Sequence, residues 1–336
     1  MNRSVLPKLM LLAGSALVGL LMLEVASRIV APIFPGARRL DAAGDPVTKT
    51  SRDDFSYIPR LVYRQVSAEY DAEVTITEFG HRVPAPVGNP EVVFIGDSFT
   101  FGTGLKDEET FAFLFCEARQ ISCANLGRID TGTHEQADIL EHFLETNGWR
   151  PREVKLVMFA MTGSLMSGND LRDNLGYDAG GKEKLVEAKD VSLRTRIAAL
   201  LRADEVVLRY SNLARWLKLA FGPSVKSLLW PSADEKQLEA ALQSTERGLR
   251  RIDALSRKYG FRYTVYLVHP VADLLRGTHV ETLEHLQKLI PDPEIELIST
   301  APLYLEEPNA YYFPIDGHIN PAGSRALARF LIEEQR

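Results

Sequence analysis

Short apolar runs, each followed by turn residues, constrain the fold of this chain more than any other feature. Such runs are typical of buried strands, and they lie at residues 91–95, 123–126, 154–161, 263–268 and 294–298. Helical patterns alternate with them, at residues 107–119, 135–146 and 321–334. Strands that alternate with helices predict a parallel, doubly wound α/β sheet with helices on both faces. Ligands bind such sheets at the carboxyl ends of the strands, near the switch point.

The N-terminus carries an uncharged apolar segment at residues 9–23, and apolar residues continue to Phe34, interrupted by Glu24 and Arg28. A membrane span needs about 20 apolar residues, and a cleaved signal peptide has a shorter core followed by an A-x-A-like site. No such site follows here. The sequence therefore favours an uncleaved signal anchor or transmembrane helix over residues 1–34, with the remaining chain extracytoplasmic, in the periplasm or on the cell surface.

Residues 35–60 contain Pro, Gly and Asp without a sustained period, and we interpret them as a linker to a domain over 61–336. Residues 61–89 are expected to form a short strand-containing lead-in. Residues 175–258 interrupt the strand–helix rhythm with a helical composition and are too long for a simple connection. They predict a helical insertion, serving as a lid or a membrane-facing cap. For 234–258, an ordinary helix flanking the sheet is the alternative.

Charge and cysteine content exclude few functions. The net charge is −6 and no basic patch is evident, which argues against nucleic-acid binding. The two cysteines, Cys116 and Cys123, fit neither a C-x-x-C redox site nor a zinc cluster. In the cytosol they would be free thiols, whereas outside it they could form a disulfide that closes a short loop.

Ser98 ends the first apolar run within a Gly-Asp-Ser tripeptide, and Gly102 and Gly104 follow it. Small residues there let the backbone turn sharply and expose its N–H groups, as a nucleophile beside an oxyanion site requires. The alternative is a serine that only caps the next helix.

A serine nucleophile needs a histidine base that is itself oriented by a third group. His318 lies in a loop before the last predicted helix, and Asp316 precedes it by two residues. The pair is therefore a candidate base and orienting carboxylate. The alternative is a turn-forming aspartate beside a surface histidine.

Two further loops follow predicted strands. Asn169, in a Gly-Asn-Asp tripeptide, can point its side-chain N–H at a developing oxyanion, although the same tripeptide is common in turns. The segment 125–133, which contains Asp130, can supply a backbone N–H to the same anion.

These four segments, in this order over about residues 91–334, resemble the SGNH/GDSL hydrolase superfamily. The segment Phe79-Gly80-His81-Arg82 is similar to the lead-in of its membrane-anchored members. The resemblance implies a flavodoxin-like five-stranded parallel sheet. It also implies Ser98 as nucleophile, His318 as general base and Asp316 as the group that holds the imidazole. The oxyanion hole would comprise the Ser98 N–H, a backbone N–H near Asp130 and the Asn169 side chain.

Two departures from the superfamily pattern bear on activity. Many members place the aspartate three residues before the histidine, and the shorter spacing here is similar to alginate O-acetylation proteins. Asp130 stands where relatives usually have the oxyanion glycine. A carboxylate there would repel the anion unless it points away. Gly127 and Gly132, in the same loop, are candidates for the flexible position that relatives fill with this glycine.

No cofactor is implied, because the glycine-rich segments lack the lysine of a phosphate loop and the third glycine of a dinucleotide fingerprint. No metal ligand spacing is evident either. Three hypotheses remain open. The chain is an esterase removing acyl, for example acetyl, groups from a carbohydrate or lipid; or an O-acyltransferase acting on an exported polysaccharide; or, given Asp130, a catalytically degenerate scaffold of an envelope assembly.

Overall fold

The structure is a computed structural model, and most of the chain is described in it. The described residues are 5–30, 56–66, 69–129, 131–160, 211, 213, 235–289, 295–314 and 316–334. They belong to two compact units, one formed by Met1–Ala37 and Glu187–Ser232, the other by Arg38–Val186 and Ala233–Arg336.

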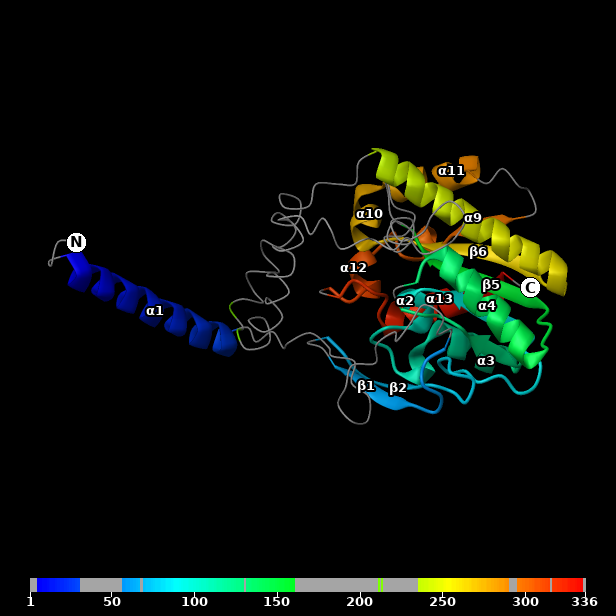
Figure 1. The fold of residues 1–336 in the computed structure, drawn as a ribbon, viewed down its shortest axis with the longest axis horizontal. Helices are drawn as coiled ribbons and strands as arrows, with labels where there is room; N and C mark the ends of the chain where they lie inside the picture. Colours follow the sequence, from blue (N-terminus) through cyan, green and yellow to red (C-terminus); the bar gives the residue numbers. More distant parts are fainter. Residues whose placement is uncertain are drawn as a thin grey trace, which may run out of the picture. The chain divides into compact units, whose positions relative to one another are not determined.

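In the first unit, the predicted N-terminal helix is α1, Val5–Val30 (Figure 1). Glu24, within its apolar stretch, pairs with Arg28 at 2.6 Å and accepts hydrogen bonds from the Ser211 hydroxyl and the Leu213 N–H. Among the residues described, no helix combines the length and the apolar character needed to span a membrane. The signal anchor over residues 1–34 stays a prediction.

The second unit is built on a parallel sheet whose strands match the five predicted apolar runs. The strands are β3 Val92–Gly96, β4 Cys123–Asn125, β5 Glu153–Phe159, β6 Arg262–Val268 and β7 Glu296–Ser299. Their order is β4-β3-β5-β6-β7 and all neighbours are parallel. The chain runs from β3 to β4 on one side and then to β5 on the other, which is the flavodoxin-like order and puts the switch point at β3.

Helices cover both faces of this sheet, as the strand–helix alternation predicts (Figure 1). On one face, α4 Thr133–Asn147 and α9 Glu235–Tyr259 bury Leu140, Leu249 and Ile252 against the strands. On the other, α3 Phe111–Arg119 and α13 Pro321–Glu333 form a second core. Thus α9 flanks the sheet, the alternative that the sequence allowed for 234–258. The rest of the predicted insertion, 175–234, lies outside the described residues except for Ser211 and Leu213.

A two-stranded antiparallel hairpin precedes the sheet, formed by β1 Val62–Val66 and β2 Asp71–Thr75. It is the strand-containing lead-in expected over 61–89. The remaining elements are short: α2 Ser98–Phe101, η1 Asp107–Glu109, α10 Val271–Arg276, α11 His279–Leu289, η2 Ala301–Leu303 and α12 Pro308–Tyr311.

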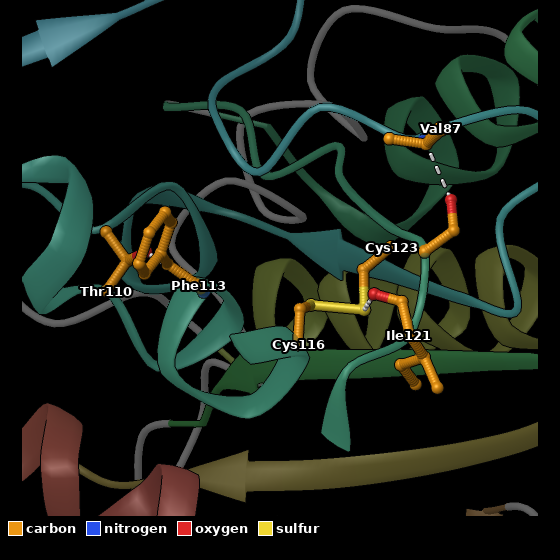
Figure 2. The surroundings of a disulfide bond; sticks show 7 residues. Val87, Thr110, Phe113, Cys116, Ile121 and Cys123 are labelled. Carbon is orange, nitrogen blue, oxygen red and sulfur yellow. Dashed lines mark hydrogen bonds between the residues drawn. A yellow bond between two sulfur atoms is a disulfide. The ribbon is translucent and has the colours of Figure 1, made fainter. Parts of the chain in front are cut away.

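A disulfide joins Cys116, in α3, to Cys123, at the start of β4 (Figure 2). The two Cα atoms lie 6.0 Å apart and the residues are separated by seven positions in the sequence. Both side chains are buried. The cross-link therefore fixes the α3–β4 connection next to the first sheet strand.

Replacing both cysteines by alanine is expected to lower the free energy of unfolding by about 2–3 kcal/mol, because a closed loop of this length restricts the unfolded chain by roughly that amount. Urea unfolding of the oxidised protein and of the double variant measures the difference. Reduced wild-type protein is the matched control and should unfold like the variant. Equal midpoints for oxidised and reduced protein would contradict the expectation.

Candidate active site

The carboxyl edge of β3 presents Ser98 as the first residue of the one-turn helix α2. The Asp97 carboxylate caps this helix by accepting the Phe99 N–H at 2.9 Å. Gly96 has a φ of +152°, and a Cβ atom there would lie 2.1 Å from the Thr100 hydroxyl oxygen and 2.3 Å from the Val157 carbonyl oxygen. Only glycine fits this position. The Gly-Asp-Ser tripeptide thus makes the sharp strand-to-helix turn that leaves the Ser98 side chain half-buried.

The structure brings together the three side chains that the sequence singled out. His318 Nε2 lies 2.7 Å from Ser98 Oγ, and His318 Nδ1 is hydrogen-bonded to Asp316 Oδ1. An Nδ1–H that donates to the carboxylate leaves Nε2 free to accept the serine proton. Ser98 and His318 are separated by 220 positions in the sequence, and the fold places them in direct contact.

Asp316 is held as a carboxylate. Partial burial on its own would raise the pKa of Asp316, but the hydrogen bond and charge of His318, together with the Tyr70 hydroxyl, outweigh it and lower the pKa below its usual value. At neutral pH the group is therefore ionised and can stabilise an imidazolium as it forms.

An aromatic wall lies beside Ser98. The Phe99 ring lies 4.7 Å from the His318 ring and stacks on Phe159 at 4.4 Å, measured between ring centroids. Phe99 is buried and Phe159, at the end of β5, is partly exposed. The wall fixes one face of the imidazole and gives an apolar surface next to the Ser98 hydroxyl.

No family model and no curated protein matches this chain. Solved structures with a similar fold include a protein from Desulfitobacterium hafniense assigned to the G-D-S-L lipolytic family (TM-score 0.43, 11% identity, 73% of this chain and 99% of that one). A second is a catalytic mutant of the acetylxylan esterase Axe2 from Geobacillus stearothermophilus, with a TM-score of 0.42 and 13% identity over 74% of this chain and 95% of that one. A third is the esterase EstA from a Pseudoalteromonas species, with a TM-score of 0.39 and 13% identity over 72% of this chain and 94% of that one. Because identity is this low, the chemistry is inferred from the side chains of this chain.

Besides Ser98, the predicted oxyanion residues and the two neighbouring glycines lie partly outside the described part of the chain. Asp130 and Asn169 lie outside the described residues. The Gly127 N–H donates to Asn125 Oδ1 at 2.9 Å, and a Cβ atom at this position would lie 2.2 Å from the Phe101 nitrogen. Gly132 precedes α4 as its N-terminal cap, with its N–H directed at Glu135. Both glycines therefore serve the local packing of the loop after β4.

Residues that the sequence did not single out individually hold this loop and helix α2 in place. Asn125, at the end of β4, donates from Nδ2 to the Thr100 carbonyl at 3.0 Å. The Arg82 guanidinium is completely buried and donates to the carbonyl oxygens of Phe101 and Leu105, at 2.8 and 2.5 Å. It also pairs with Asp107 at 3.2 Å. Burial lowers the pKa of Arg82, and Asp107 opposes that effect. In the sequence, the segment Phe79-Gly80-His81-Arg82 was the feature that could have pointed to Arg82.

Replacing Arg82 by methionine should lower the free energy of unfolding by about 3–5 kcal/mol, because the change leaves the buried carbonyl oxygens without this donor and removes the cation that pairs with Asp107, which keeps the Thr75 N–H. Unfolding of the variant and of wild type in denaturant measures this loss of free energy. The matched control is Arg64→Met, since Arg64 pairs with Asp71 at the surface and such exposed pairs contribute about 0–1 kcal/mol. Similar losses for the two variants would show that the buried guanidinium does not hold the segment after Ser98.

Within the described residues, no group of three or more His, Cys, Asp or Glu side chains is arranged to hold a metal ion. The groups assembled at the β3 edge are instead a hydroxyl, an imidazole and a carboxylate in series. That arrangement suits nucleophilic attack by an activated serine.

Proposed function

We propose that this chain is a serine esterase of the SGNH/GDSL type that cleaves acyl esters with Ser98, His318 and Asp316. The observation that carries the proposal is the continuous hydrogen-bonded series from Ser98 Oγ through His318 to Asp316, with 2.7 Å between Oγ and Nε2. It lies at the switch point of a flavodoxin-like sheet, where such folds bind ligands. The substrate would be an acylated carbohydrate or lipid.

In the proposed mechanism, Ser98 Oγ attacks the ester carbonyl carbon while His318 Nε2 takes the hydroxyl proton. The resulting imidazolium is stabilised by the Asp316 carboxylate and then gives its proton to the departing alcohol. Water, deprotonated by His318, releases the acyl group from Ser98. The Ser98 N–H, a backbone N–H near Asp130 and the Asn169 side chain are proposed to bind the oxyanion.

Transfer to a sugar hydroxyl is the second candidate, favoured by the two-residue spacing between Asp316 and His318. It needs the same triad and differs only in the acceptor that attacks the acyl-enzyme. A catalytically degenerate scaffold is the third, and it predicts that Ser98 has no enhanced reactivity.

An assay with a chromogenic acetyl ester, with and without an oligosaccharide acceptor, separates these functions. Release of acetate alone supports the esterase, and acetylation of the oligosaccharide supports the transferase. Absence of both reactions, together with no labelling of Ser98 by a fluorophosphonate, would refute the enzyme and support the scaffold.

We further propose an extracytoplasmic location for the catalytic domain, with α1 as its attachment to the membrane. The Cys116–Cys123 disulfide supports the first part, because such bonds persist in oxidising compartments. The uncharged stretch at residues 9–23 supports the second. Fractionation and protease accessibility in intact cells test both, and recovery of the chain in the cytosol with reduced cysteines would refute them.

A further inference from the structure

The β1–β2 hairpin contacts the catalytic aspartate from outside the sheet. Tyr70, in the connection between its two strands, donates its hydroxyl to Asp316 Oδ2 at 3.0 Å. The other carboxylate oxygen, Oδ1, is the one that binds His318 Nδ1. The neighbouring Glu69 accepts the backbone N–H of Asp316 through Oε2 at 2.7 Å. The hairpin therefore holds Asp316 at both its side chain and its backbone.

Packing fixes the position of Tyr70 itself. Its ring packs on Phe313, with 5.1 Å between the ring centroids. It also lies against Gly104, where a Cβ atom would come within 2.7 Å of the ring. The Gly104 N–H in turn donates to Gln65 Oε1, in β1, at 2.8 Å. Tyr70 is thus held between the loop that follows the nucleophile helix and the loop that carries Asp316.

A second donor matters because an aspartate carboxylate rotates easily about the Cβ–Cγ bond, whose torsion angle has only a weak preference. A hydrogen bond to Oδ2 opposes that rotation and keeps Oδ1 directed at the imidazole. The same hydrogen bond draws negative charge away from the carboxylate, so the Asp316 carboxylate attracts an imidazolium less strongly. Among the described residues, the titratable groups hydrogen-bonded to Asp316 are His318 from its own loop, Tyr70 from the hairpin, and the Glu69 carboxylate, which accepts the backbone N–H of Asp316.

We propose that Tyr70 is a positioning residue that acts through Asp316, extending the Ser98–His318–Asp316 series to a fourth member. The inference rests on the proposed function and deepens it. It assigns the hairpin a role in catalysis: the hydroxyl of Tyr70 fixes the orientation of Asp316 and so keeps Oδ1 directed at the imidazole that acts as the base.

The test is Tyr70→Phe, which keeps the ring against Phe313 and removes only the hydroxyl. For the chromogenic ester, kcat is expected to fall about 10- to 150-fold with KM nearly unchanged, since that is the range to which the strength of a hydrogen bond to a charged group converts. The acid limb of kcat/KM should move to higher pH, because a less solvated carboxylate favours the protonated imidazole. Nuclear magnetic resonance of the resting enzyme should show the same rise in the pKa of His318.

The matched control is Tyr259→Phe, at the end of helix α9, which removes a similar hydroxyl–carboxylate hydrogen bond, here to Glu145 on helix α4. It should leave kcat and the acid limb at wild-type values. If Tyr70→Phe behaves likewise, or loses only thermal stability, the inference is overturned. If wild-type protein is no more active than Ser98→Ala, the proposed function fails instead, and an unchanged His318 titration in Tyr70→Phe would then overturn the inference separately.

Discussion

Replacing Ser98 by alanine is expected to lower kcat for ester hydrolysis by about 10⁵- to 10⁶-fold, as removal of the nucleophile does in other serine hydrolases. The Ser98 hydroxyl contacts His318 Nε2 at 2.7 Å, so it is the group from which the imidazole can take a proton. The fold should be unaffected, because Ser98 is only half-buried and helix α2 is capped by Asp97. Initial rates with a chromogenic acetyl ester measure the loss.

Labelling with a fluorophosphonate gives an independent readout of the same prediction. Wild-type protein should be labelled at Ser98, and the Ser98→Ala variant should not be labelled. The matched control is Ser256→Ala, on helix α9, whose hydroxyl donates to the Phe261 carbonyl and makes no contact with the triad. It should keep both activity and labelling. A Ser98→Ala variant that retained either would exclude Ser98 as the nucleophile.

The strands of the sheet could be predicted because parallel strands are buried on both faces and therefore appear as continuous apolar runs. Every residue of β3, Val92–Gly96, is buried. The short helices had no comparable signal. Helices α10 and α12, each preceded or begun by a proline, are six and four residues long, too short for a helical period to develop.

The meeting of Ser98, His318 and Asp316 could be predicted because each residue stands in a recognisable local setting. Ser98 follows a buried strand, and Asp316 and His318 share one loop before a helix. Tyr70 and Glu69 had no such setting, since their contacts with Asp316 join residues about 246 positions apart. Arg82 was part of a noted segment, but its burial beneath the nucleophile helix depends on tertiary packing. The roles of Asp130 and Asn169 stay predictions.

Replacing Asp316 by asparagine is expected to lower kcat at neutral pH by about 10³- to 10⁴-fold while leaving the fold intact, because the carboxylate selects the imidazole tautomer with its proton on Nδ1. An asparagine that presents its N–H₂ group to Nδ1 would favour the other tautomer, whose protonated Nε2 cannot accept from Ser98. The loss should exceed that of Tyr70→Phe, which leaves the carboxylate in place. Steady-state kinetics of the two variants and of Asp253→Asn, an aspartate paired with Arg257 on α9, make the comparison.

The same substitution should also change the dependence of stability on pH. The pKa of Asp316 is lowered in the folded protein, so its contribution to stability is complete above the pKa of an unfolded aspartate, about 4. That contribution is lost as the pH falls through the lower folded value. The difference in free energy of unfolding between wild type and Asp316→Asn should therefore become smaller as the pH is reduced from 7 to about 3. A gap that is constant over this range, with kcat unchanged at neutral pH, would show that Asp316 neither holds a depressed pKa nor orients His318.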